Sequence, residues 1–180
     1  EVKRYSLYNW DNGKPLQPLL SAPERRAYKY AVGDPPPTPP LDVSAFVEDL
    51  RTTDALVFVY PTWWFSLPAA LKGLIDRTFI PGVAFRFAEG ADDKGTTGLV
   101  PGLTNIKRVG IVTTFGSTRQ ITLLAGDHGH GILTRALLPL FNPRCTISWL
   151  GLWEMNTQNA EGCRRFIARV RHEYEKEFLP

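Results

Sequence analysis

The feature that most constrains this chain is a short, uninterrupted apolar run at residues 55–60, bounded by Asp54 and Pro61. A run of this length without polar interruption is typical of a strand that is buried on both faces of a parallel sheet. We therefore expect a central parallel strand here. Similar runs predict two more buried strands, at 108–113 and 146–152.

Helical patterns alternate with these strands. Residues 43–50 place apolar side chains at i, i+3, i+4 and i+7, and Asp42 is expected to cap this helix. Further helices are predicted over 68–79, over 132–141 and after Asn159, which can act as an N-cap. This alternation predicts an α/β fold, an open parallel sheet with helices on both faces and with ligands bound at the carboxyl ends of its strands.

The remaining segments are shorter or rich in turns. Residues 2–8 are expected to form a half-exposed edge strand, and 9–40 a long loop with one helical turn near 23–30. A small hairpin is expected around 83–87. No repeat and no composition shift divides the chain, so we expect a single domain over 1–180.

The composition excludes several classes of protein. The chain is 43% apolar and 22% charged, which argues against disorder, and a net charge of +3 without charge runs gives no support for nucleic-acid binding. No apolar run approaches the roughly 18 residues of a membrane span, so no integral membrane segment is expected. Only two cysteines occur, Cys145 and Cys163, without a disulfide framework, and the expected location is the reducing cytoplasm.

The strongest local signal is the aromatic loop that follows the first apolar strand. Pro61, Thr62, Trp63, Trp64 and Phe65 leave the carboxyl end of that strand, where loops build the crevice of open α/β sheets. The rings could stack on a flat conjugated ligand. They could equally cap the core or seal an oligomer interface.

An equivalent loop follows the next strand. Thr113, Thr114, Gly116 and Ser117 offer hydroxyl groups, backbone amides and a glycine that permits close approach to a ligand. The alternative is an ordinary strand-to-helix turn. Two such loops on neighbouring strands favour a binding site.

Two histidines, His128 and His130, lie in a glycine-rich stretch at 126–131. Zinc takes three or four protein ligands, and no cysteine or carboxylate cluster accompanies them, so no metal is expected. A histidine that moves protons near neutral pH and an unremarkable loop histidine both remain open. The absence of G-x-G-x-x-G, Walker and G-x-S-x-G motifs removes the usual dinucleotide-fold, NTPase and hydrolase interpretations.

The run at 54–77, DALVFVYPTWWFSLPAALKGLIDR, resembles the flavodoxin-like NAD(P)H:quinone oxidoreductase family, of the DT-diaphorase and modulator-of-drug-activity type. The segments at 81–85, Thr113-Thr114-x-Gly116 and His128-Gly129 match the same family in the same order. The resemblance implies a flavodoxin-like sheet of strand order 2-1-3-4-5, noncovalent FAD or FMN, and NAD(P)H as co-substrate. It also implies a quinone substrate and a homodimer.

The resemblance also assigns roles to residues. His128 corresponds to a histidine that in some relatives lies above the flavin and helps to place charge or a proton, so it is the expected catalytic residue. The expected cofactor-binding residues are Pro61, Thr62, Trp63, Trp64, Phe65, Thr113, Thr114, Gly116 and Ser117.

The chain departs from the family at its beginning. Relatives start with a buried strand, a loop containing His-Pro and Ser that binds the flavin phosphate, and a helix, and none of these precedes residue 2 in the sequence. Either this sequence omits ordinary N-terminal residues, or this is a truncated relative that binds flavin weakly. The intact aromatic loop and Thr113-Thr114-x-Gly116 loop favour the first explanation. Separately, the resemblance leaves open a regulatory subunit of a potassium efflux system as an alternative to a freestanding enzyme.

Overall fold

The computed structural model describes residues 1–28, 34–88 and 98–178. Its contacts divide the chain into two compact units. The first comprises Glu1–Thr52 and Ala69–Asn105, and the second comprises Thr53–Pro68 and Ile106–Pro180. Within the described ranges, no helix is long and apolar enough to cross a bilayer.

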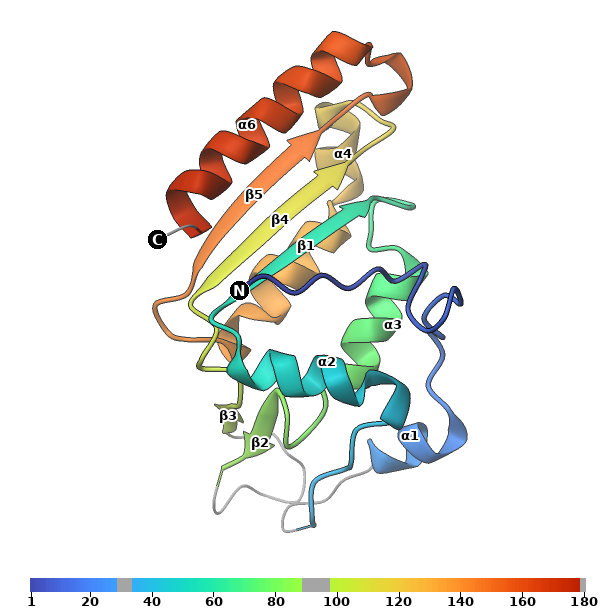
Figure 1. The fold of residues 1–180 in the computed structure, drawn as a ribbon, viewed down its shortest axis with the longest axis vertical. Helices are drawn as coiled ribbons and strands as arrows, with labels where there is room; N and C mark the ends of the chain where they lie inside the picture. Colours follow the sequence, from blue (N-terminus) through green and yellow to red (C-terminus); the bar gives the residue numbers. More distant parts are fainter. Residues whose placement is uncertain (29–33, 89–97, 179–180) are drawn as a thin grey trace. The chain divides into compact units, whose positions relative to one another are not determined.

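The second unit contains the predicted parallel sheet. Its strands are β1 (Ala55–Pro61), β4 (Arg108–Thr114) and β5 (Thr146–Leu152), in the order β1-β4-β5. Both pairs are parallel, so the three carboxyl ends lie at one edge of the sheet (Figure 1). The register aligns Phe58 with Ile111 and Ile111 with Trp149.

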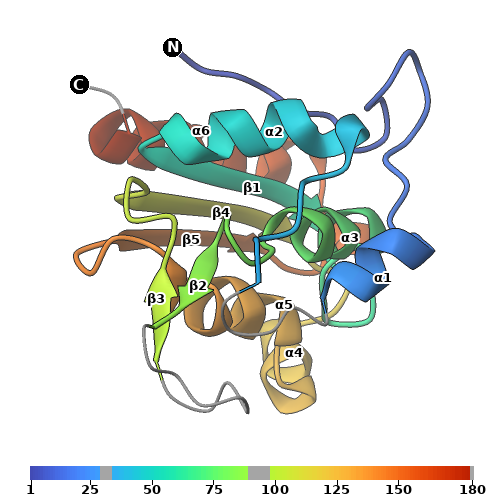
Figure 2. The same cartoon turned by 90° about the horizontal axis from the view of Figure 1, so that it is seen from below.

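Helices cover the two faces of this sheet. Helix α6 (Ala160–Phe178) packs so closely on one face that a Cβ added at Gly110 would lie 2.5 Å from the hydroxyl of Tyr174. On the opposite face, to which Trp149 belongs, α5 (His128–Gly131) places the His130 ring 5.4 Å from that of Trp149. The α/β class with helices on both faces is therefore confirmed, and the views in Figures 1 and 2 agree with it.

Two strand predictions are wrong in detail. Strand β1 lies at the edge of the described sheet, and Val57 and Val59 are 43% and 75% exposed, so it is not buried on both faces. Apolar side chains favour burial but do not supply the neighbour that buries them. Residues 2–8 form no strand, because their backbone pairs with no described strand.

The helix expected over 132–141 is also different. The chain forms α4 (Arg119–Ala125), α5, a π-helical turn η1 (Ile132–Ala136) and a 3-10 turn η2 (Leu138–Leu140). Gly126 and Asp127 have φ of 99° and 38°, which ends α4 and forces a new start. A second 3-10 turn, η3 (Met155–Thr157), precedes α6, where the Asn159 side chain accepts from the Gly162 N–H as predicted.

Among its described residues, the first unit contains three helices and a pair of antiparallel strands. Its helices are α1 (Ala22–Ala27), α2 (Leu41–Thr52) and α3 (Ala69–Thr78). Strands β2 (Phe85–Phe87) and β3 (Leu99–Pro101) pair antiparallel, side by side in Figure 2. The predicted helical turn and amphipathic helices are thus present, although the expected turn and loop extend partly outside the described residues. The hairpin expected around 83–87 differs, because the strand at 85–87 pairs with residues 99–101.

Asp42 does not cap α2, contrary to expectation. The helix begins one residue earlier, and the Asp42 carboxylate accepts two hydrogen bonds from the Arg77 guanidinium, of 2.7 and 2.8 Å. Arg77 is only 4% exposed and also donates to Glu24 at 2.6 Å and to the Gln17 carbonyl at 3.0 Å. A buried guanidinium needs such partners, and that need outweighs the local capping preference of an aspartate.

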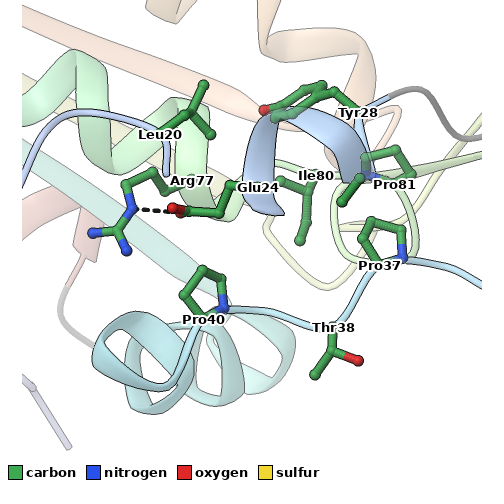
Figure 3. Close-up of a pocket in the computed structure, with 10 residues that line it drawn as sticks. Leu20, Glu24, Tyr28, Pro37, Thr38, Pro40, Arg77, Ile80 and Pro81 are labelled. Atoms are coloured by element: carbon green, nitrogen blue, oxygen red, sulfur yellow. Dashed lines mark hydrogen bonds and ion pairs between the residues drawn. The ribbon is translucent and has the colours of Figure 1, made fainter. Parts of the chain in front are cut away.

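A small hollow adjoins this ion pair (Figure 3). Its volume is about 20 Å³, and its wall includes Leu20, Tyr28 and Ile80. Roughly 10–15 Å³ is needed to hold one water molecule. The hollow is therefore too small for an organic substrate, and the network around Arg77 is structural.

Candidate active site at the carboxyl ends of β1 and β4

An open groove of about 210 Å³ lies at the carboxyl edge of the sheet. It is formed by the two loops that leave β1 and β4. The lining residues are Thr62, Trp63, Trp64, Phe65, Phe115, Gly116 and Ser117. Ligand sites in α/β sheets lie at this edge because the loops that follow neighbouring parallel strands meet there.

The aromatic wall of the groove is a tight turn with an unusual backbone. The N–H of Trp63 donates to the Ser66 carbonyl at 3.2 Å, and the Ser66 N–H donates to the Trp63 carbonyl at 3.0 Å. The two residues between them, Trp64 and Phe65, have φ of 49° and 55°. Bulky residues disfavour this left-handed region, and such strain is concentrated at functional sites.

The turn leaves its two largest rings uncovered. Trp63 is 62% exposed and Trp64 is 92% exposed. A large exposed aromatic surface beside a groove indicates a site for a ligand or a partner. The turn therefore presents flat rings that are available for stacking.

The groove also carries unpaired hydrogen-bond donors. The backbone N–H groups of Trp64, Phe65, Gly116 and Ser117 have no acceptor among the described residues. Backbone N–H groups are obligatory donors that must find an acceptor in the protein, in a ligand or in water. Four donors around one hollow suit a ligand whose edge carries several acceptor atoms.

The base of the groove is held rigidly between the strands. The Thr114 carbonyl accepts from both the N–H and the hydroxyl of Thr62, at 2.9 and 2.6 Å. The N–H of Phe115 donates to the Leu152 carbonyl at 2.8 Å, so the same peptide group is fixed on both sides. Thr113 lies deeper and is 1% exposed.

The predicted histidine lies beside the groove and does not line it. His128 is exposed, and its ring lies so close to Gly126 that a Cβ there would come within 3.1 Å of its Cε1 atom. The next residue, Gly129, donates from its N–H to the Phe65 carbonyl at 3.4 Å, which joins α5 to the aromatic turn.

Tyr60, near the end of β1, is a further titratable group close to this site. Burial, together with the charge of Asp127, raises the pKa of the Tyr60 hydroxyl well above its usual value.

The structure therefore brings most of the sequence-predicted binding residues together. Thr62, Trp63, Trp64, Phe65, Gly116 and Ser117 share the groove, whereas Pro61, Thr113, Thr114 and His128 lie beneath or beside it. Their roles in binding stay predictions.

The aromatic residues that support this loop, Trp149 of β5 and Trp153 just beyond it, were missed from the sequence. Trp153 stacks on Phe115 with ring centres 5.4 Å apart and planes within 7°, and Trp149 lies 5.4 Å from Trp153. The available signal was two tryptophans, four positions apart, at the end of a predicted strand.

Comparison with known proteins supports an assignment from this geometry. Residues 4–160 match the model of a family described as having a flavodoxin-like fold. The chain belongs to this flavodoxin-like family. A solved NAD(P)H:quinone oxidoreductase from Methanothermobacter marburgensis superposes with a TM-score of 0.67 over 91% of this chain and 77% of that one, at 22% identity, which supports the fold.

Two curated proteins match over shorter segments. NAD(P)H dehydrogenase (quinone) 1 of Rattus norvegicus is 34% identical over 88 residues, or 49% of this chain and 29% of that protein. An FMN-dependent NADH:quinone oxidoreductase of Nitratidesulfovibrio vulgaris is 35% identical over 80 residues, or 41% of this chain and 36% of that protein. The matches thus span about a third of each curated relative's length.

Proposed function

We propose that this protein is a flavin-dependent NAD(P)H:quinone oxidoreductase that binds FAD or FMN noncovalently in the groove between β1 and β4. The observation that carries the proposal is a set of four backbone N–H donors, without an acceptor among the described residues, beside two exposed tryptophan rings. The names of the two curated relatives support the reaction class, and one of them names FMN.

The groove fits one part of a flavin. The isoalloxazine ring system is flat, and its pyrimidine edge carries carbonyl oxygens and a ring nitrogen that accept hydrogen bonds. These atoms complement the N–H groups of Gly116 and Ser117 on one side and of Trp64 and Phe65 on the other. The volume of about 210 Å³ is below the roughly 300 Å³ at which ligand pockets begin, so the groove would hold the ring edge and not the whole cofactor.

The chemistry would be divided between cofactor and protein. A bound flavin supplies a ring that accepts a hydride from NAD(P)H and passes two electrons to a quinone. The four N–H groups would stabilise negative charge at the ring edge, because preorganised donors favour an anion more than a neutral acceptor. His128, which adjoins the turn through Gly129, is proposed to hold or move a proton near the ring.

Flavin titration tests the proposal directly. We expect saturable quenching of FMN or FAD fluorescence by the purified protein, and NAD(P)H oxidation that requires both flavin and a quinone. Trp64→Ala should weaken flavin binding roughly 3- to 10-fold through lost stacking. Leu124→Ala is a matched control, since Leu124 is 89% exposed on α4 and does not line the groove.

The outcomes separate clearly. Absence of saturable quenching with either flavin would refute the proposal. An equal loss of affinity in both variants would show that the aromatic turn has no specific role in binding.

We further propose a homodimer located in the cytoplasm. The exposed rings of the aromatic turn, Trp63 and Trp64, supply apolar surface of the kind that subunit contacts cover. Both cysteines, Cys145 and Cys163, are free, as the reducing cytoplasm favours. Light scattering of the flavin-loaded protein at micromolar concentration should give twice the mass of one chain, and a monomer would contradict the assembly.

A further inference from the structure

The loop that carries Gly116 is hydrogen-bonded to the segment that follows β5, residues 153–155. We propose that Trp153 is a positioning residue that, with the backbone of Glu154 and Met155, fixes the direction of the Gly116 N–H in the groove. This inference rests on the proposed function only where it concerns flavin. Its structural part concerns the protein alone.

Three backbone hydrogen bonds join the two segments. The Phe115 N–H donates to the Leu152 carbonyl at 2.8 Å, as the ends of β4 and β5 meet. Beyond the sheet, the Met155 N–H donates to the Phe115 carbonyl at 2.9 Å, and the Glu154 N–H donates to the Ser117 carbonyl at 3.0 Å. The contact therefore continues past the last paired strand residues.

The bond to the Phe115 carbonyl sets the direction of the Gly116 amide. In a trans peptide the C=O and the following N–H lie in one plane and point in opposite directions. Because Met155 holds the Phe115 carbonyl on its own side, the Gly116 N–H must point away from Met155. That N–H has no acceptor among the described residues and belongs to a residue that lines the groove.

Trp153 links the side chains of the two segments. Its ring is stacked on Phe115, which is 2% exposed, and the Arg119 guanidinium lies over it at 5.6 Å from the ring centre. Stacked aromatic pairs and cation–π contacts both favour one relative placement of the groups involved. Trp153 thus joins the loop, the first residue of α4 and the segment after β5.

The backbone after Trp153 needs this support. Glu154 has φ of 58°, in the left-handed region that residues other than glycine disfavour. It lies between Trp153 and Met155, whose N–H makes the decisive bond. Loss of the indole removes the side chain that anchors this strained residue, so the Met155 N–H is expected to leave the Phe115 carbonyl and the Gly116 peptide to reorient.

The test compares Trp153→Ala with Trp153→Phe in the full chain. Without flavin, the Gly116 amide is observed by ¹H–¹⁵N NMR and the Met155 amide by hydrogen exchange. With flavin, the dissociation constant and the reduction potential of the bound flavin are measured. Ile147→Ala, a substitution in β5 away from the loop, is the control for general loosening of the sheet.

In Trp153→Ala we expect a shifted Gly116 amide resonance and faster hydrogen exchange at the Met155 amide. Flavin binding should weaken roughly tenfold, because loss of one hydrogen bond to a charged or strongly polar group has about this effect on affinity. The bound flavin should become harder to reduce, since a donor to the ring edge favours the reduced anion. Trp153→Phe keeps a stacking ring and should stay close to wild type in every measurement.

Unchanged Gly116 and Met155 amides in Trp153→Ala would overturn the inference, whatever the flavin does. The same changes in Ile147→Ala would also overturn it, since they would reflect general loosening. If the wild-type protein binds no flavin, the proposed function fails, and the amide measurements still decide whether Trp153 positions the loop.

Discussion

The left-handed backbone of the aromatic turn makes an unusual prediction about glycine. At Trp64, φ is 49° and the side chain is 92% exposed, so the residue is strained and loses little packing when truncated. We compare Trp64→Gly with Trp64→Ala. Both remove the indole, but only alanine retains the Cβ that causes the strain.

The magnitude follows from two opposing effects. A residue with a Cβ in the left-handed region costs about 1–2 kcal/mol, which glycine avoids. Glycine in turn loses about 0.5–1 kcal/mol relative to alanine through the greater freedom of the unfolded chain. Trp64→Gly should therefore be more stable than Trp64→Ala by about 0.75 kcal/mol, the difference between the mid-points of these two ranges.

Urea denaturation of the two variants measures this difference. The matched control is the pair Leu124→Gly and Leu124→Ala, because Leu124 is 89% exposed inside helix α4. There glycine should be the less stable variant by about 0.5–1 kcal/mol, the opposite sign. If alanine were the more stable variant at both positions, Trp64 would not be strained in solution and the functional argument from strain would fail.

Three further predictions concern packing and charge. Arg77→Met should lower the free energy of unfolding by about 3 kcal/mol, because Glu24 then stays largely buried without its partner. Asp42→Asn should lower it by at most about 1 kcal/mol, because the Asp42 carboxylate is half-exposed. Equal losses for the two variants in urea denaturation would contradict this difference.

Burial alone would raise the pKa of Glu24, but its bonds with Ser21 and Arg77 hold that pKa below the usual 4.5. Glu24→Gln should therefore lower the free energy of unfolding most at neutral pH, and this loss should shrink as the pH falls below about 4.5. If the loss stayed the same at acidic pH, the assigned direction of the pKa shift would be wrong. Tyr174→Phe removes a buried hydroxyl that has no partner among the described residues, so thermal melts should show unchanged or higher stability, and a clear loss would reveal a partner.

Local pattern was sufficient to predict much of the fold. The apolar run of β4 and the periodicity of α2 and α3 record the burial of side chains within one element, which a single segment can encode. The patterns of β1, β5 and α6 located those elements as well. The two loops of the candidate site followed from the same reasoning, since the loops that leave parallel strands meet at one edge. Four of the five residues in the aromatic loop line the groove as the pattern predicted.

Features that depend on distant partners were decided only by the tertiary structure. Asp42 has the residue type of a helix cap, yet it pairs with Arg77, 35 residues away, because a buried guanidinium requires a carboxylate. The left-handed turn at Trp64 had no local signal, since aromatic residues disfavour it. The distant Gly129, whose N–H donates to the Phe65 carbonyl, helps to hold it, together with the bonds between Trp63 and Ser66. Strain and ion pairing are properties of the assembled chain, because their free energy depends on which distant groups come into contact.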